Sequence, residues 1–269
     1  MTEPLVSILV PLYNRHSLFN RSLWNLFGQT YRDYEIIVVD DGSDASFEFE
    51  YLDGAKAPPF RFQRIRPPGS RDRGPNMAWW EAWRMAEGDF IICTHPEILV
   101  PRNAIELMLR YHIPFNRSVP TQYTISGWRQ QHRIDRVDWK KNMEALKHLP
   151  DFWDEVGRWN YTNRQATEYT HHFSFTGQTR EEWERYGFIP ETSEPNMDDS
   201  WMREQEVAAG FPPTHLPMIE VYHQWHLPLP HQAPWRDGGL GGVKAKRFIE
   251  ADRVLAKEWL PDDRQWAAT

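Results

Sequence analysis

The 269-residue chain has a single cysteine, Cys93, and no long hydrophobic run. One cysteine excludes an internal disulfide and any metal site that needs several cysteine ligands. No apolar stretch approaches the ~20 residues that a helix needs to cross a bilayer. The N-terminal segment carries an acid, Glu3, where a secretory signal peptide needs basic residues. We therefore expect a cytoplasmic protein with no membrane span.

Positive charge is not in excess either. Lysine and arginine number 31 against 38 aspartates and glutamates, which gives a formal net charge of −7. Attraction to nucleic acid or acidic lipid is therefore not favoured overall. The basic run RFQRIRPPGSRDR at 61–73 is a local exception, which either faces an anionic ligand or forms a solvated loop. A hydrophobic content of 40% is ordinary for a soluble protein with one large domain or two small ones.

Tryptophan and histidine are abundant by contrast, with 14 and 11 residues. Flat aromatic faces suit sugar rings, because the apolar C–H side of a sugar stacks on them while its hydroxyl groups stay solvated. Most of these tryptophans are nevertheless expected in the core or at interfaces, so their number alone assigns no function.

The first third of the chain alternates predicted strands and helices. Apolar runs predict buried strands at 5–14, 34–43 and 90–93, and weaker alternation predicts a less buried strand at 60–66. Helices are predicted from Ser17, as the cap, to Gly28, from Pro75 to near Gly88, and from about 102 to 112. This βαβα order predicts an α/β fold with a parallel sheet covered by helices.

Polar clusters follow three of the predicted strands. They are Tyr13-Asn14, Asp40-Asp41-Gly42-Ser43 and Thr94-His95-Pro96-Glu97. Ligands of open α/β sheets bind outside the carboxyl ends of the strands. We therefore expect the three clusters to form one joint site rather than three independent turns.

The rest of the chain is less regular. A strand is predicted at 121–128, a helix at 138–149, a strand, turn and short helix at 171–188, and a helix at 194–211. The last of these helices has two acids, Asp198 and Asp199, in its first turn and Gly210 past its end. Beyond 235, a glycine-rich linker precedes an amphipathic helix.

Three segments, SILVPLYNR, LFGQTYRDYEIIVVDDGS and GDFIICTHPEILVP, together resemble the family 2 glycosyltransferases of GT-A fold over residues 5–101. Residues 171–226 resemble the acceptor half of that family more loosely, through FTGQTREEWERYGFIPE, MDDSWMRE and VYHQWH. The resemblance implies a GT-A fold, with a mixed, mainly parallel sheet flanked by helices. It also implies a hexosyl- or related transferase of EC class 2.4, which moves a sugar from a nucleotide diphosphate to an acceptor hydroxyl with inversion.

The same resemblance divides the chain into parts. Residues 1–235 would form one GT-A domain, with a nucleotide-sugar-binding half at 1–112 and an acceptor half at 113–235. Residues 236–269 would form the linker and the C-terminal helix.

In such enzymes the end of the first strand and the acidic turn hold the nucleoside. The resemblance gives that role here to Pro11, Tyr13, Asn14, Asp41 and Gly42. Asp41 would accept a hydrogen bond from a uracil imide, so the expected donor is a UDP-sugar. The residues Asp, Gly and Ser are also ordinary turn formers, and a plain turn is the alternative.

The diphosphate position departs from the family. The family usually carries two aspartates, one residue apart, that hold a divalent cation, and Thr94 and Pro96 stand at those two positions. His95 and Glu97 remain, and an imidazole with a carboxylate favours manganese or another transition ion over magnesium. Two alternatives stay open. Either the site is metal-free and Arg71 or Arg73 neutralises the diphosphate, or His95 donates directly to phosphate.

A histidine late in the fold often completes the metal shell in enzymes of this kind. The segment EVYHQWHLPLPH offers His223, His226 and His231, and His223 best matches the family position. The resemblance therefore implies a metal site of His95, Glu97 and His223. For each histidine, a packed or surface position without a ligand is the alternative.

Inverting transfer needs a general base that takes the proton of the attacking hydroxyl. The family places an acidic pair before a helix for this task, which implies Asp199 as the base and Asp198 as a partner of the acceptor hydroxyl. Trp201 stands beside the pair and could stack on a sugar, and Glu191 is a weaker acceptor-site candidate. The alternative for the acids is helix capping, which a first turn favours without catalysis.

A different class of function is a nucleotide-sugar- or glycan-binding module that has lost catalysis, because such loss would also remove the aspartate pair. The retained acids Asp198 and Asp199 argue against it. The acceptor stays open between a glycan, a protein side chain and a hydroxymethylated base in modified DNA. Nucleic acid is therefore expected only as an acceptor, through a local basic groove.

Overall fold

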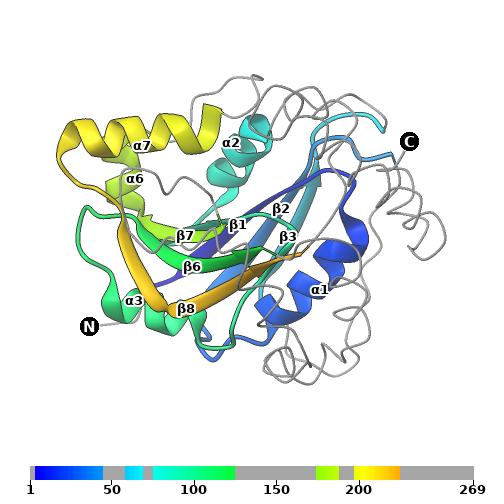
Figure 1. The fold of residues 1–269 in the computed structure, drawn as a ribbon. Coiled ribbons are helices and arrows are strands. Elements are labelled where there is room, and N and C mark those ends of the chain that lie inside the picture. Colours follow the sequence, from blue (N-terminus) through cyan, green and yellow to red (C-terminus); the bar gives the residue numbers. More distant parts are fainter. Residues whose placement is uncertain (1–3, 45–57, 69–74, 125–173, 188–196, 225–269) are drawn as a thin grey trace, which may run out of the picture.

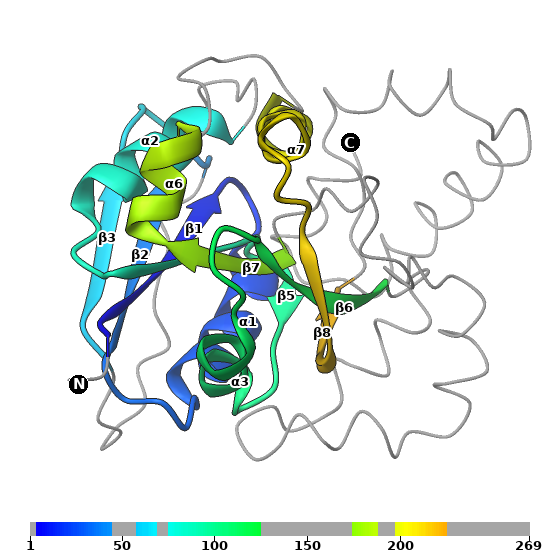
Figure 2. The same ribbon diagram turned by 90° about the vertical axis from the view of Figure 1, so that its left-hand side faces the viewer.

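The structure, a computed structural model, describes residues 4–44, 58–68, 75–124, 174–187 and 197–224. The described strands form one eight-stranded sheet in the order β3-β2-β1-β4-β7-β6-β8-β5 (Figures 1 and 2). Helices lie on both faces of this sheet, as the alternation of elements predicts.

The first half of the sheet is parallel. It consists of β1 (Val6–Leu12), β2 (Tyr34–Asp40), β3 (Phe60–Arg64) and β4 (Phe90–Thr94). Every residue of β1, β2 and β4 is buried, since strands covered on both faces require continuous apolar sequence. The half-buried β3 lies at the edge. The predicted parallel sheet is confirmed.

The second half of the sheet is mixed. It consists of β7 (Ser174–Thr179), β6 (Ser118–Thr124), β8 (Thr214–His223) and the short β5 (Ile98–Leu99). Strand β7 is antiparallel to β4 and to β6, and β8 is parallel to β6 but antiparallel to β5. The pairings of β4 with β7 and of β5 with β8 therefore join the two predicted halves in one sheet.

Two hydrophobic clusters hold the helices to the sheet. Helices α1 (His16–Phe27) and α3 (Ala104–Tyr111) pack on one face with alternate residues of β1 such as Ile8 and Val10. Helices α2 (Asn76–Met85), α6 (Arg180–Tyr186) and α7 (Met197–Ala209) contribute to the cluster of the other face, which includes Leu9. Figure 2 shows the two groups of helices on opposite sides of the strands. This arrangement is the α/β layering expected from the sequence.

Local details differ from the predictions at four places. Helix α1 begins at His16, one residue before Ser17, and no side chain caps it. Strand β7 passes into α6 without an intervening turn, because the Thr179 side chain accepts a hydrogen bond from the Glu182 backbone and forms a capping box. Strand β8 was not predicted, and the predicted strand at 121–128 begins earlier, at Ser118.

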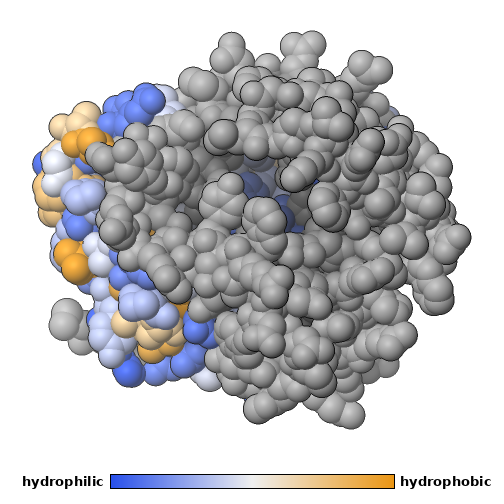
Figure 3. Space-filling view, viewed as in Figure 1, coloured by the Kyte–Doolittle hydropathy of each residue, from blue (hydrophilic) through white to orange (hydrophobic). Residues whose placement is uncertain are grey.

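Several expectations fall outside the described residues. These are the helix at 138–149, the domain boundary at 235 and the tail at 236–269. Among the helices of the described segments, none is long and apolar enough to cross a bilayer. In the coloured part of Figure 3, hydrophobic and hydrophilic residues are interspersed over the surface.

Candidate functional site

The end of β1 and the acidic turn after β2 are joined by hydrogen bonds around Asn14. Its backbone N–H donates to Ser43 Oγ at 2.8 Å, and its Nδ2 donates to Asp44 Oδ2 at 3.0 Å. The backbone N–H of Asp44 donates in return to Asn14 Oδ1 at 2.8 Å. Asn14 has a φ of 48°, a left-handed conformation that asparagine tolerates better than most residues. The structure thus brings two of the three predicted clusters together.

Asp40 shapes the acidic turn. The carboxylate of Asp40 is buried and accepts hydrogen bonds from the backbone N–H and the hydroxyl of Ser43, at 3.0 and 2.5 Å. Its other oxygen accepts from Arg64 Nε at 2.7 Å. Gly42 has a φ of 88°, which explains a glycine at this point of the turn. Because both oxygens of Asp40 bind the protein, Asp41 is the acid of the pair suited to a ligand.

Asp41 lies beside a cation that the sequence patterns did not single out. Arg66 Nε lies 2.8 Å from Asp41 Oδ1, and the exposed fractions of the two side chains are 26% and 3%. The backbone N–H of Asp41 donates to Leu12 O at 2.9 Å, which fixes the turn to the end of β1. Pro11 is buried in β1 opposite Val39, and Tyr13 is half-buried just beyond that strand.

Only the first part of the basic run at 61–73, up to residue 68, is among the described residues. Its first residues form β3, and three of its arginines face carboxylates of β2 and the acidic turn. Arg61 pairs with Glu35, Arg64 with Asp40 and Arg66 with Asp41. These cations therefore balance buried acids, and the solvated-loop interpretation is wrong for 61–66. Arg71 and Arg73 lie outside the described residues.

The third predicted cluster follows β4. Thr94 is buried, and the backbone oxygen of His95 accepts a hydrogen bond from Ile98 N at 3.2 Å, which closes the turn. The His95 ring packs edge-on against Trp79 of α2, with 5.9 Å between ring centroids. His95 is therefore on the side of the sheet that α2 covers.

Glu97 and His223 lie together. Glu97 Oε1 is 3.3 Å from His223 Nε2, because Ile98 of β5 pairs with His223 of β8. Burial lowers the pKa of the Arg15 guanidinium to about 10, while the nearby charge of Glu97 opposes that shift. Glu97 thus faces both an imidazole and a buried guanidinium, at the same edge of the sheet as Asn14.

Gln224 fixes this arrangement. Its backbone N–H and its Nε2 both donate to Glu97 O, at 3.1 and 3.2 Å, and Nε2 also donates to Leu18 O of α1 at 3.1 Å. Arg21 Nη1 donates to Gln224 Oε1 at 3.1 Å. The end of β8 is therefore held to both α1 and the Glu97 turn.

The predicted metal site is only partly assembled. Within the described segments, no group of three or more His, Cys, Asp or Glu side chains is placed to hold a metal ion. Glu97 and His223 are close enough to share an ion, and an imidazole with a carboxylate suits manganese. His95 contacts Trp79 instead. The pair fits two ligand positions, and His95 as a third ligand stays a prediction. His226 and His231 lie outside the described residues.

The acidic pair lies at the start of α7, as predicted. Asp198 and Asp199 are in its first turn, and the structure describes the backbone but not the side chains of these two residues. Helical periodicity puts Asp199 on the same face of α7 as Met202 and Glu206, three and seven positions later. Both of these later residues are fully buried. Glu191 lies outside the described residues.

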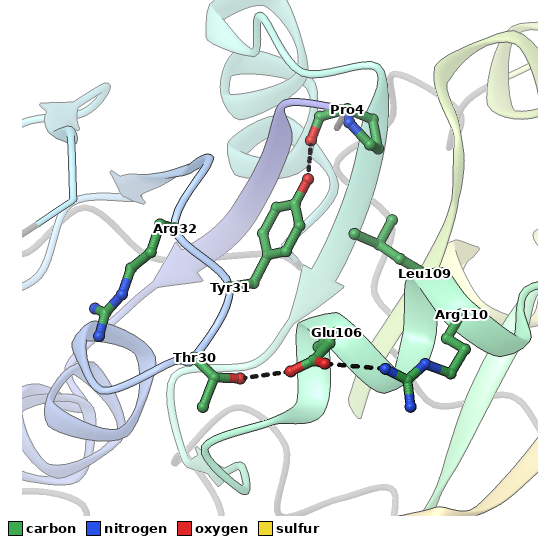
Figure 4. Close-up of a pocket in the computed structure, with 7 residues that line it drawn as sticks. All are labelled: Pro4, Thr30, Tyr31, Arg32, Glu106, Leu109 and Arg110. Carbon is green, nitrogen blue, oxygen red and sulfur yellow. Dashed lines mark hydrogen bonds and ion pairs between the residues drawn. The ribbon is translucent and has the colours of Figure 1, made fainter. Parts of the chain in front are cut away.

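A separate pocket of about 530 Å³ lies at the amino end of β1, away from these clusters (Figure 4). Thr30 Oγ1 donates to Glu106 at 3.0 Å and Arg110 pairs with the same carboxylate at 3.1 Å. Tyr31 donates its hydroxyl to Pro4 O at 2.5 Å. None of the predicted site residues lines this pocket, and the polar groups of Thr30, Tyr31, Glu106 and Arg110 already have partners within it.

Comparisons with known proteins agree with the resemblance. A model of Glycosyl transferase family 2 matches residues 7–179, more than half of the chain. An uncharacterized glycosyltransferase of Haemophilus influenzae is 29% identical over 114 residues, which are 41% of this chain and 43% of that protein. An uncharacterized glycosyltransferase of Rickettsia bellii is 45% identical over 111 residues, 41% of this chain and 15% of that protein. The matches span less than half the length of these curated relatives.

Solved structures share the fold. The mannosyltransferase PcManGT from Pyrobaculum calidifontis, in complex with GDP-Man and Mn²⁺, superposes with a TM-score of 0.54 at 17% identity, over 99% of this chain and 69% of that one. S. aureus TarS in complex with UDP-GlcNAc gives a TM-score of 0.53 at 14% identity, over 94% of this chain and 66% of that one. The expected GT-A fold is confirmed.

Proposed function

The chain belongs to glycosyl transferase family 2, and from that premise we propose that it transfers a sugar from a UDP-sugar to an acceptor hydroxyl with inversion. The observation that carries the proposal is the joined pair of strand ends. Asn14 and the turn of Asp40 to Asp44 form one hydrogen-bonded unit at the carboxyl edge of the sheet, where open α/β sheets bind their ligands.

The nucleoside half of the donor would bind at this unit. Asp41 offers a carboxylate to the imide N–H of uracil, and Arg66 holds that carboxylate in place at 2.8 Å. A guanidinium beside it could also donate to a uracil carbonyl. TarS, which shares the fold, was crystallised with UDP-GlcNAc, and PcManGT with GDP-Man. The carboxylate of Asp41 would give the imide N–H of uracil the acceptor that it needs.

The diphosphate would lie at the turn after β4. Glu97 and His223, with His95 as the third predicted ligand, would hold a manganese ion there. Such an ion, when bound, neutralises the charge that develops on the leaving diphosphate. Arg15 supplies a buried positive charge next to Glu97.

Proton removal from the acceptor would be the task of α7. Both acids stand in the first turn of α7, and the family pattern makes the second acid of such a pair the base. We therefore assign the general base to Asp199 and contact with the acceptor hydroxyl to Asp198. Inversion then follows, because the hydroxyl attacks the anomeric carbon opposite the leaving diphosphate.

An inactive nucleotide-sugar- or glycan-binding module remains the second candidate, because Thr94 and Pro96 replace the usual aspartates. The acceptor class is also open, including a hydroxymethylated DNA base. Thermal unfolding with a panel of nucleotide sugars, with and without manganese, tests the donor, since a ligand that binds only the folded state raises the melting temperature. Binding accompanied by release of free diphosphate nucleotide supports the enzyme. Binding without turnover on any acceptor supports the module.

A further inference from the structure

Strand β7 contains a strained bulge next to β4. Thr176 pairs with Cys93 and Ser174 pairs with Thr94, so Phe175 is an extra residue between them. Phe175 has a φ of 65°, a left-handed conformation that is unfavourable for a bulky side chain. Its ring is nevertheless fully buried in the cluster under α1 and α3. Strain of this kind persists where the surroundings enforce it, often beside functional sites, and bulges redirect neighbouring side chains.

Two buried hydroxyls flank this bulge. Ser174 is 3% exposed and Thr176 is fully buried. Among the residues that the structure describes, neither Ser174 Oγ nor Thr176 Oγ1 has a hydrogen-bond partner. Buried hydroxyls normally find partners, and those of Ser7 and Ser43 do so with Glu35 and Asp40. Two hydroxyl groups of β7, each able to donate and to accept a hydrogen bond, therefore lie beside the end of β4 without a partner among the described residues.

The order of the strands indicates which part of a donor they would meet. The proposed nucleoside site spans the ends of β2 and β1, and the proposed diphosphate site follows β4. Strand β7 is the next strand in the sheet, about 4.8 Å further along. Ser174 lies directly opposite Thr94, the first residue of the predicted diphosphate cluster. The group that extends beyond the diphosphate of a nucleotide sugar is the transferred sugar.

We infer that Ser174 and Thr176 form the subsite for the transferred sugar and exchange hydrogen bonds with its hydroxyl groups. The inference rests on the proposed function. The bulge at Phe175 then has a clear physical role, because it offsets the register of β7 at the point where the two hydroxyls flank the site. Thr179, further along the same strand, caps α6 with its hydroxyl and takes no part.

Calorimetric titration with bare nucleotides and with nucleotide sugars isolates the contribution of these two hydroxyls to binding of the sugar. Wild type, Ser174→Ala and Thr176→Val are titrated with UDP and GDP and with their glucose, N-acetylglucosamine and mannose conjugates. Each variant should bind the bare nucleotide as wild type does and should bind the preferred nucleotide sugar about tenfold more weakly. Thr30→Val is the matched control, since its hydroxyl contacts Glu106 at the other end of the sheet, and it should change neither affinity.

The melting temperatures of the free proteins give a second readout. Thr176→Val keeps the shape of the side chain and removes a hydroxyl with no protein partner, so its melting temperature should equal or exceed that of wild type. A clear fall would mean that the hydroxyl serves the protein and would overturn the inference. Unchanged affinity of both variants for the nucleotide sugar would also overturn it. A wild type that binds no nucleotide at all would overturn the proposed function, and this inference with it.

Discussion

Arg117, the residue before β6, and Glu206 of α7 form an ion pair in which both side chains are fully buried. Arg117 Nε lies 2.9 Å from Glu206 Oε1, and Nη2 donates to Oε2 at 3.1 Å. Burial raises the pKa of Glu206, and the charge of Arg117 opposes this. Because Glu206 follows Asp199 by seven positions on the same face of α7, the pair holds the helix that carries the proposed base.

Arg117→Met should lower the free energy of unfolding by about 3–5 kcal/mol, because it leaves the Glu206 carboxylate buried without its partner. The double variant Arg117→Met, Glu206→Met should regain most of this loss, since an apolar pair of similar volume needs no charge compensation. Urea unfolding measures both. Arg110→Met is the control, because Arg110 pairs with Glu106 at the surface, where such pairs contribute up to about 1 kcal/mol. A double variant as unstable as the single one would contradict the argument.

Asp41→Ala should weaken the binding of UDP by about 1.5–3 kcal/mol, the typical contribution of a hydrogen bond to a charged group. The loss has two physical parts, because the variant removes the acceptor for the uracil imide and also frees the Arg66 side chain. Isothermal calorimetry with UDP measures it. Glu87→Ala is a suitable control, since Glu87 is an exposed carboxylate that pairs with Arg61 of β3. If UDP binds Asp41→Ala as tightly as wild type, Asp41 is not part of the site.

The parts of the fold that the sequence predicted are those with a simple local pattern. Strands β1, β2 and β4 are buried on both faces, and continuous apolar runs identify such strands. Strand β8 was missed because its burial neither alternates nor continues, and Pro217 interrupts it. Its pairing with β6 also shifts register between Pro120 and Thr121, which no local signal indicates.

The sequence predicted that two of the strand-end clusters would meet, and their role as a site stays a prediction. Asn14 and the acidic turn meet because the ends of parallel neighbours share one edge of the sheet. The partner of Asp41 was not predictable, since Arg66 reaches it through the register of β2 and β3, which no local pattern in the sequence specifies. Equally, nothing in the local pattern reveals that His95 faces Trp79 while Glu97 faces His223.

The contact between His112 and Glu182 should make stability depend on pH. Burial alone would raise the pKa of Glu182, but hydrogen bonds from His112 and from the backbone of Phe115 and Thr179 outweigh it and lower that pKa. A carboxylate with a lowered pKa in the folded state stabilises the protein above its unfolded pKa of about 4.3. This stabilisation is lost as the pH falls through the lower, folded value.

Glu182→Gln should therefore reduce the free energy of unfolding at pH 7, and the difference from wild type should shrink as the pH falls below about 4.3. Urea unfolding between pH 7 and pH 3 measures this. Glu106→Gln serves as the control because its carboxylate is partly exposed, and it should show little dependence. A difference between Glu182→Gln and wild type that stays constant over the whole range would exclude the contact as its source.

Asp199→Asn should keep donor binding and lower transfer by about 10²-fold or more, because the amide is similar in size but cannot accept the proton of the acceptor. Product formation and donor calorimetry, measured on the same preparation, separate the two effects. Asp198→Asn is the matched variant, one position away in the same turn. If Asp198→Asn loses transfer and Asp199→Asn does not, the two roles are exchanged. If both variants stay active, the acids only stabilise the start of α7.

Manganese should strengthen donor binding if Glu97, His223 and His95 share an ion, and the effect should be absent in the presence of a chelator. Glu97→Gln and His223→Ala should each remove most of the manganese-dependent gain in affinity, because the two side chains lie 3.3 Å apart and provide the carboxylate and imidazole ligands. Calorimetric titration of UDP with manganese, and then with chelator, measures the gain without any need for turnover. Glu184→Gln, an exposed change on α6, is the control.

His95→Ala decides the third ligand. The His95 ring packs against Trp79, so it must move away from Trp79 before it can bind a metal ion. If it moves on donor binding, His95→Ala should lose the manganese-dependent gain in UDP affinity. Retention of the full effect in His95→Ala would restrict the protein ligands to Glu97 and His223, with the diphosphate oxygens completing the shell. Wild-type affinity that ignores both manganese and chelator would exclude the ion. The positive charge at the diphosphate would then come from side chains, and Arg15, buried beside Glu97, is a candidate among the residues that the structure describes.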